Sequence, residues 1–249
     1  MIVRFSISRP VFALLLSLAG IAIVGCSMHG RPGAGPEVVR PEEVLDFPTL
    51  YNQNCAACHG NNGKNGAAIS LANPVYIELT GQANLQNIIA HGVSGGLMPP
   101  FAKSSGGMLT DKQILALAQG MVQQWGNASS AAGQTLPPYL ATLTGNAEHG
   151  QQAYGIFCAR CHGVNGGGAA ANATGEVGKL GSIVDPSYLA LISNQDLRSI
   201  LIAGRPDLGM PDWRNDAAQP MNDQQITDIL AWLASKRVSN PGQPYPTQP

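Results

Sequence analysis

Two short segments contain the residue types most able to do chemistry, and they share one pattern. Each segment reads Cys-x-x-Cys-His-Gly, and the second begins 103 positions after the first. The reactive residues are Cys55, Cys58 and His59 in one segment and Cys158, Cys161 and His162 in the other. Two thiols at this spacing can add across the vinyl groups of a porphyrin, and the adjacent imidazole can then bind its iron. The sequence therefore predicts two covalently bound haem c groups, with both histidines as iron ligands.

Four cysteines in two pairs could instead hold a structural zinc ion or form disulfides. Three features of the sequence oppose these alternatives. A histidine follows each second cysteine directly, and each motif lies between a helix-like approach and a loop rich in glycine and asparagine. A further candidate iron ligand also recurs downstream of both motifs. Covalent haem is therefore the preferred interpretation.

Each motif is followed by a methionine in a loop rich in glycine and proline. Met98 lies in Gly-Gly-Leu-Met-Pro-Pro-Phe, and Met210 lies in Asp-Leu-Gly-Met-Pro-Asp-Trp. A glycine segment can bring a thioether over an iron, and the proline behind it stiffens the loop. We therefore expect Met98 and Met210 to be the sixth ligands of the two irons. Because a thioether favours the ferrous state, both haems should have fairly high reduction potentials.

Three other residues compete for the role of sixth ligand. Met108 and Met221 are the neighbouring methionines, and they fill gaps in cores as readily as they bind iron. Met221 aligns with Leu109 in the other half of the chain, as a core residue would. His91 is the remaining rival, but the aligned position of the second half is an alanine. The matched positions of Met98 and Met210 therefore favour those two residues.

The similarity between the two halves extends well beyond the motifs, so the chain contains an internal repeat. Around the motifs the offset is 103 residues, and further along it becomes 112. The second copy therefore carries nine extra residues in its loop near 169–182. Aligned pairs include Tyr51 with Tyr154, Pro74 with Pro186, Phe101 with Trp213 and Asp111 with Asp223.

Each copy is expected to form three short helices separated by loops, which makes the fold all-α. The first helix should span about 42–55 and 146–158, and the second about 84–90 and 194–203. The third should begin with a capping Asp or Thr and shows apolar residues at helical spacing. These are Ile114, Leu117, Met121 and Trp125 in one copy and Ile226, Ile229, Leu230 and Leu233 in the other. Each copy has fewer than 100 residues, so a covalent haem would complete its small core.

From about Glu42 to Arg237 the chain resembles two class I bacterial cytochrome c domains in tandem. The resemblance rests on the Cys-x-x-Cys-His motif near the front of each copy, the Met-Pro loop and the closing amphipathic helix. It implies two domains, each with a few short helices wrapped around a covalent haem that transfers single electrons through a six-coordinate iron. It also implies that Pro74 and Pro186 offer a carbonyl to the proximal histidine, the alternative being ordinary loop prolines.

The amino-terminal segment has the features of an export signal. Arg4 and Arg9 accompany an apolar run from Val11 to Val24, which is short against the roughly 20 residues of a membrane-spanning helix. The following Ile-Val-Gly-Cys resembles the bacterial lipoprotein processing box, so residues 1–25 are interpreted as a signal peptide. Cys26 would then carry the acyl chains that hold the protein at a membrane. The alternatives are an uncleaved anchor and simple secretion with Cys26 as a free thiol.

Composition predicts the remaining organisation of the chain. Residues 26–41 are rich in Gly, Pro and Arg and should form a flexible tether. The expected order is then a first cytochrome c domain at 42–126, a linker at 127–145, a second domain at 146–238 and a disordered tail at 239–249.

Charge and ligation together indicate the class of function. The formal net charge is −1 and charged residues make up 12% of the chain, so a nucleic-acid partner is not expected. We expect an electron-transfer protein rather than an enzyme, lipid-anchored on the periplasmic side of the bacterial envelope. It would carry electrons from a quinol-oxidising complex or periplasmic dehydrogenase towards a terminal oxidase or reaction centre of a respiratory or photosynthetic membrane complex. The alternative is a dihaem redox enzyme of the peroxidase or thiosulfate dehydrogenase type, with one open haem site.

Overall fold

The computed structural model describes residues 35, 38–168, 180–214 and 219–239. The chain divides into two units, 1–41 and 42–249, and the second unit contains both Cys-x-x-Cys-His motifs. The predicted signal peptide, Cys26, most of the tether and nearly all of the predicted tail lie outside the described residues. Within the described part of the chain, no helix is both long and apolar enough to cross a membrane.

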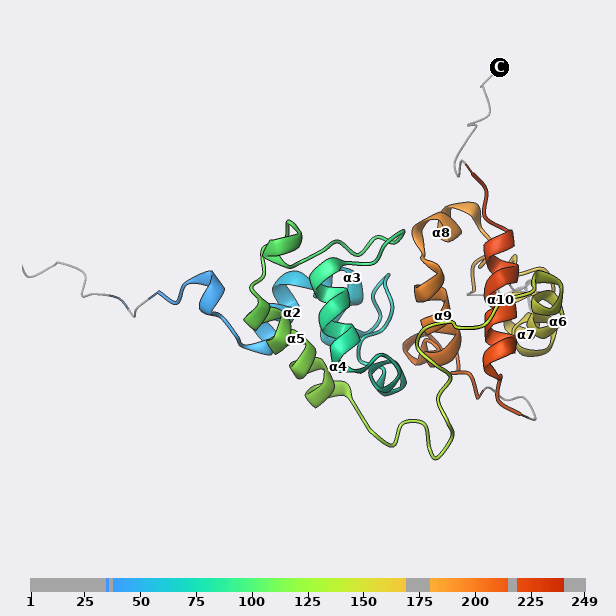
Figure 1. Ribbon diagram of the computed structural model, residues 1–249, viewed down its shortest axis with the longest axis horizontal. Helices are drawn as coiled ribbons and strands as arrows, with labels where there is room; N and C mark the ends of the chain where they lie inside the picture. Colours follow the sequence, from blue (N-terminus) through green and yellow to red (C-terminus); the bar gives the residue numbers. More distant parts are fainter. Residues whose placement is uncertain (1–34, 36–37, 169–179, 215–218, 240–249) are drawn as a thin grey trace, which may run out of the picture. The chain divides into compact units, whose positions relative to one another are not determined.

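Helices form both copies, which confirms the predicted all-α fold. In the described ranges the only bridges are two isolated pairs, Ala102 with Leu109 and Arg205 with Met210. The first copy contains η1 (Pro41–Glu43), α2 (Phe47–Asn54), α3 (Ala56–His59), η2 (Asn61–Gly63), α4 (Pro74–His91), η3 (Lys103–Ser105) and α5 (Asp111–Trp125) (Figure 1). The second contains α6 (Ala147–Phe157), α7 (Ala159–His162), α8 (Pro186–Leu191), α9 (Asn194–Ala203), η4 (Pro206–Leu208) and α10 (Asp223–Ser235).

The closing helices α5 and α10 begin at side chains that satisfy their free backbone N–H groups. The Thr110 side chain accepts a hydrogen bond from Gln113 N, and the Gln113 side chain accepts one from Thr110 N. Asn222 and Gln225 form the same capping box at α10. The predicted Thr cap is therefore confirmed for α5. In the second copy the cap is Asn222, so Asp223 is the first residue of the helix and not its cap.

Helix α4 is longer than the predicted helix over 84–90, and it contains a break. At Gly81 the backbone has φ 67°, so two helical segments follow one another inside α4. Gly81 aligns with Ser193, which is the N-cap of α9 and separates it from α8. One element of the first copy therefore corresponds to two of the second. The prediction missed the first segment because its apolar residues are nearly continuous and lack a 3.6-residue period.

The segment 127–145 contacts both copies. Its Ser130 hydroxyl and Ala131 N–H donate to the Glu78 carboxylate of α4. Its Pro138 carbonyl accepts from the buried guanidinium of Arg198 on α9 at 2.7 Å. This segment is therefore attached at one end to the first copy and at the other to the second.

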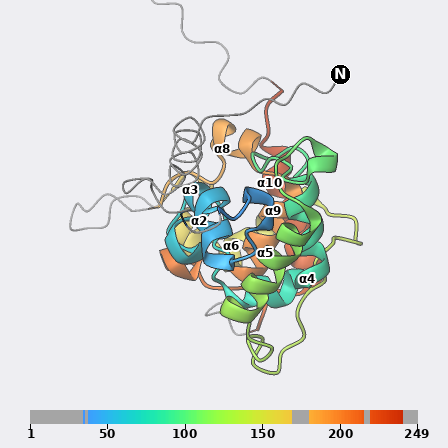
Figure 2. The ribbon, with the colours of Figure 1, turned by 90° about the vertical axis from the view of Figure 1, so that its left-hand side faces the viewer.

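The first and last helices of each copy pack closely, with an aromatic residue of one helix against a glycine of the other. The two copies place the aromatic residue on different helices. Helix α2 packs on α5 (Figure 2), and α6 packs along α10 (Figure 1). In the first copy the Phe47 ring of α2 lies directly against Gly120 of α5. In the second copy Gly150 of α6 lies against α10, where a Cβ would be 2.9 Å from Trp232 Cβ. Phe47 aligns with Gly150, and Gly120 aligns with Trp232. The aromatic residue is therefore on the first helix in the first copy and on the last helix in the second, and the glycine is on the facing helix each time.

Replacing Gly150 by Ala should lower the free energy of unfolding by about 2 kcal/mol, because the new methyl meets the Asp228 backbone and overpacks the helix pair. The matched control is Gly155→Ala on the same helix, where nothing lies within 4 Å. That change should stabilise by about 0.5 kcal/mol through helix propensity. Denaturant unfolding of the haem-loaded protein measures both, and equal effects of the two variants would contradict the close packing.

Candidate haem-binding sites

Each Cys-x-x-Cys-His motif forms a single helical turn that follows a longer helix. Cys55 lies between α2 and α3, and the N–H groups of Cys58 and His59 both donate to its carbonyl, at 3.2 and 3.0 Å. The second motif repeats this arrangement, with two hydrogen bonds of 3.1 and 3.0 Å to the Cys158 carbonyl. Both cysteines and the histidine of each motif are therefore held within one turn of backbone.

A tyrosine hydroxyl holds the far end of each motif. Tyr51 Oη donates to the Gly60 carbonyl at 2.8 Å, and Tyr154 Oη donates to the Gly163 carbonyl at 2.6 Å. Both tyrosines are buried, and their rings contact a tryptophan of the closing helix. The sequence identified these residues only as an aligned pair of the internal repeat. Their position four residues before the first cysteine in both copies was the available signal for the additional hydrogen bond.

A backbone carbonyl holds the His59 ring in one orientation. It is 8% exposed, and its Nδ1 lies 2.8 Å from the Ile69 carbonyl oxygen. Since a carbonyl can only accept, Nδ1 carries the proton, which leaves the lone pair on Nε2. Burial lowers the pKa of His59, although the hydrogen bond to Ile69 opposes this shift. The neutral ring with a free Nε2 is the form that binds a metal.

This hydrogen bond corrects the expectation about Pro74. The acceptor is Ile69, and Pro74 is instead the first residue of helix α4. Proline is favoured at that position because its missing N–H would have no partner there and its φ is already helical. Pro186 occupies the same position in α8.

His162 differs from His59 in its surroundings. Burial lowers the pKa of His162 as well, so this ring is also neutral. Its Nδ1 is buried, but no atom of the described residues accepts its hydrogen bond. Ile69 aligns with Gly181, at the end of the longer loop of the second copy. As far as the described residues go, the two sites therefore share a neutral imidazole but not the carbonyl that orients it.

The cysteines fit attachment to a porphyrin. None of the four motif cysteines forms a disulfide, and within the described ranges no group of three or more His, Cys, Asp or Glu is placed to hold a metal ion. Burial, reinforced by the neighbouring cysteine, raises the pKa of Cys55 and of Cys158 to about 12. These sulfurs are therefore uncharged at neutral pH. A thioether is also uncharged, whereas a zinc site would require buried thiolates.

The two methionine loops fold back in the same way on the helix that precedes them. Val93 N donates to the Met98 carbonyl at 3.1 Å, and Arg205 N donates to the Met210 carbonyl at 3.0 Å. The helices end at Gly92 and Gly204, whose φ angles are 72° and 68°. A Cβ at either glycine would lie within 2.7 Å of the methionine carbonyl, so only glycine allows this close return.

The competing candidates lie in other environments. Met221 is buried and Met221 N donates to the Trp213 carbonyl, as Leu109 N donates to that of Phe101, which confirms the predicted core role. Met108 is 78% exposed. His91 is exposed at the end of α4, with its Nδ1 3.1 Å from the Asn87 carbonyl oxygen. Met98 and Met210 are both partly buried.

Two family models match this chain, one in each copy. Residues 42–119 match cytochrome c oxidase, cbb3-type, subunit III, and residues 147–236 match cytochrome c. The cbb3-type cytochrome c oxidase subunit CcoP of Azospirillum sp. (strain B510) is 28% identical over 158 residues, 57% of this chain and 48% of that protein. CcoP of Azospirillum brasilense is 29% identical over 151 residues, which are 54% of this chain and 46% of that protein. The chain spans about half the length of the curated relatives it matches.

Among solved structures, a chain of the reducing HAO-like protein complex of Kuenenia stuttgartiensis matches with a TM-score of 0.45 and 18% identity. The match covers 82% of this chain and 99% of that one. Each family match contains one complete Cys-x-x-Cys-His motif and the methionine loop of the same copy. The chain therefore consists of two tandem cytochrome c domains, one matched by each family model, which bind two covalently attached haem c groups.

Proposed function

We propose that this protein is a membrane-tethered dihaem cytochrome that passes single electrons from a quinol-oxidising complex or periplasmic dehydrogenase towards a terminal oxidase or reaction centre. The observation that carries the proposal is the repeated ligand set. Each copy combines a neutral motif histidine with a methionine on a loop that returns to the preceding helix. Haem c supplies the one-electron iron couple. An iron with two protein ligands has no free position for a substrate, so electron transfer is the activity that remains.

The residues of this chain have separate roles in the proposal. His59 and Met98 hold one iron, and His162 and Met210 hold the other. The Ile69 carbonyl fixes the tautomer and orientation of the first imidazole. Thioether ligation favours the ferrous state, so both haems work at fairly high potential.

The relatives support a role beside an oxidase. Both Azospirillum proteins are described as subunits of a cbb3-type cytochrome c oxidase. We propose that this chain serves either as a subunit of such a membrane complex or as its electron carrier. Charged residues make up only 12% of the sequence, so docking should depend on short-range contact and little on ionic strength.

Optical spectra of the purified haem-loaded protein test the proposal. Oxidised and reduced spectra should show two low-spin haems, and carbon monoxide should leave the reduced spectrum unchanged. Rapid carbon monoxide binding by one haem would overturn the proposal, because it would reveal an open iron site. The dihaem redox enzyme of the peroxidase or thiosulfate dehydrogenase type would then become the better interpretation.

Tethering by Cys26 is a separate part of the proposal. Replacing Cys26 by Ser should move most of the protein from the membrane fraction to the soluble periplasmic fraction, because stable anchoring requires the acyl chains on that thiol. Fractionation followed by haem staining measures the change, with Ser27→Ala as the control. Full retention of the Cys26 variant in membranes would instead indicate an uncleaved helix or a membrane partner.

A further inference from the structure

In the described part of the unit 42–249, three residues donate hydrogen bonds directly from one copy to the other. Arg205 Nη2 donates to the Gly66 carbonyl at 3.0 Å, and Asn65 N donates to Asp207 Oδ2 at 2.9 Å. Asn73 Nδ2 donates to the Ala203 carbonyl at 2.8 Å, and Asn73 is 1% exposed. These polar contacts therefore connect the loop after the first haem motif to the methionine loop of the second copy.

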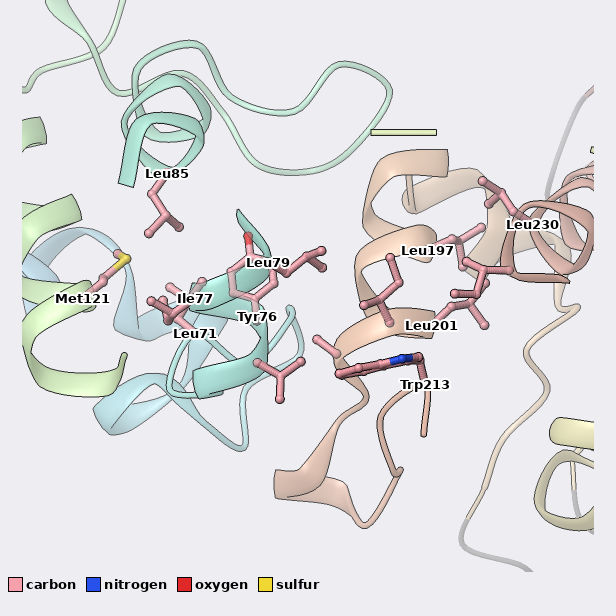
Figure 3. Close-up of a cluster of buried hydrophobic side chains, with 14 of the residues drawn as sticks. Leu71, Tyr76, Ile77, Leu79, Leu85, Met121, Leu197, Leu201, Trp213 and Leu230 are labelled. Carbon is pink, nitrogen blue, oxygen red and sulfur yellow. The ribbon is translucent and has the colours of Figure 1, made fainter. Parts of the chain in front are cut away.

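An apolar contact lies beside these hydrogen bonds. Helix α4 of the first copy contacts α9 of the second. Figure 3 shows Tyr76 and Leu79 of α4 and Leu197 and Leu201 of α9 in one cluster of buried side chains. Of the three donors only Asn73 is buried, so a missing partner would leave a polar group without water at that hydrogen bond, whereas the bond from Asn65 is exposed.

The contact made by Arg205 reaches the backbone of both iron-ligand segments. On one side Gly66 lies against the first motif, since a Cβ there would overlap the backbone of Cys58 and His59. On the other side the Arg205 main chain pairs with Met210 in both directions, with N···O distances of 3.0 Å. A single residue therefore connects the peptide that carries His59 to the peptide that carries Met210.

The guanidinium of Arg205 is held rigidly in this position. Its Nε and Nη2 donate to the two carboxylate oxygens of Asp207, each at 3.0 Å. The Arg205 side chain is 11% exposed and that of Asp207 3%. Two parallel hydrogen bonds fix the plane of the guanidinium as well as its distance from the carboxylate, which a lysine could not reproduce.

The residues of this contact differ from their counterparts in the repeat. Arg205 aligns with Val93, and Asp207 aligns with Gly95. Asn73 aligns with Asp185, which caps helix α8 as Asn73 caps α4. A carboxylate can cap a helix but cannot donate to the Ala203 carbonyl. A cytochrome c domain of this chain can therefore form without these residue types, which leaves the contact between the copies as their role.

We propose that Arg205 is a positioning residue that, with Asp207 and Asn73, locks the two haem-binding domains together for electron transfer between them. The inference rests on the proposed function, because it assigns a structural requirement to the step between the two haems. The two bound haems would supply both the donor and the acceptor of that electron, so no further reactant is needed. The lock keeps the first motif and the second methionine loop in one fixed arrangement while this happens.

The test uses the haem-loaded full chain with four variants. Arg205→Gln removes the lock, and Arg205→Lys keeps the charge without the paired geometry. Asn73→Asp introduces the residue that the second copy already uses, so it preserves the helix cap and removes only the contact. The control is Arg237→Gln, which removes an arginine that donates to the Leu189 and Ile192 carbonyls inside the second copy.

Two readouts are measured. Exchange NMR of the haem methyl signals at half reduction gives the rate of transfer between the haems. It should fall about tenfold or more in Arg205→Gln and Asn73→Asp, because small losses of positioning have large effects on rate. Arg205→Lys should lie between these and the wild type, and Arg237→Gln should match the wild type. Scanning calorimetry should show one unfolding transition in the wild type and two separated transitions in Arg205→Gln.

Unchanged exchange rates and a single transition in both Arg205→Gln and Asn73→Asp would overturn the proposal. An equal loss in Arg237→Gln would also overturn it, because the effect would then come from general destabilisation. Carbon monoxide binding by the wild type would instead count against the proposed function. That outcome leaves the calorimetric result interpretable, so the two failures are distinguishable.

Discussion

Replacing Met210, the proposed sixth ligand, by Ala should make the second haem bind carbon monoxide, where the wild-type protein should bind none. The alanine methyl cannot donate to iron, so the reduced iron acquires a free position for an external ligand. The reduction potential of that haem will also fall, because the ligand that favours the ferrous state is lost. Carbon monoxide titration should then give about one bound molecule per protein, and Met98→Ala should do the same for the first haem.

The matched control for these variants is Met108→Ala. Met108 is a methionine of the same region but is 78% exposed, so its removal should change neither the spectrum nor the potential. A Met210→Ala protein that ignores carbon monoxide and keeps its potential would show that another residue holds the iron. In the first copy the residue to examine next would be His91, which lies at the end of α4.

Replacing Arg198 by Met will lower the free energy of unfolding by about 3 kcal/mol. The Arg198 side chain is 1% exposed and forms an ion pair with Asp223. It also donates to the Pro138 carbonyl at 2.7 Å and to Thr227 Oγ1 at 3.2 Å. Methionine can fill most of the space, but it leaves the carboxylate and the carbonyl without a donor in a largely dry environment.

Urea unfolding of the haem-loaded protein followed by circular dichroism measures this loss. Arg214→Met is the comparison, because Arg214 pairs with Asp212 in the second methionine loop but the two side chains are 29% and 17% exposed. Water screens that pair, so its loss should cost less than about 1 kcal/mol. Similar small decreases in the free energy of unfolding of both variants would show that burial does not strengthen the contribution of the Arg198 hydrogen bonds to stability.

The haem motifs could be recognised from sequence because covalent attachment requires the reacting residues to be close along the chain. Cys55, Cys58 and His59 lie within one helical turn. The methionines are distant from the motifs, and the internal repeat selected them as the candidate ligands. Two independent copies placed Met98 and Met210 at matched positions, while Met221 matched a leucine and proved to be buried.

The sequence could not predict which backbone carbonyl accepts a hydrogen bond from the motif histidine. Every residue offers a carbonyl, so nothing in the residue types distinguished Ile69 from Pro74 as the partner of His59. The start of α4 was missed for a related reason, since a nearly continuous apolar run has no helical period. The exchange of Phe47 and Gly120 for Gly150 and Trp232 became visible only when the facing helices were known.

The sequence by itself determined the cofactor chemistry, because thiol and imidazole at fixed short spacing define it, and the all-α fold, because capping residues and apolar periods are local. The tertiary structure alone decided how the two domains meet. Arg205 and Gly66 are 139 residues apart, and Asn73 and Ala203 are 130 apart. Contacts over such separations depend on which surfaces the folded domains present to each other, and no local pattern of residues records that arrangement.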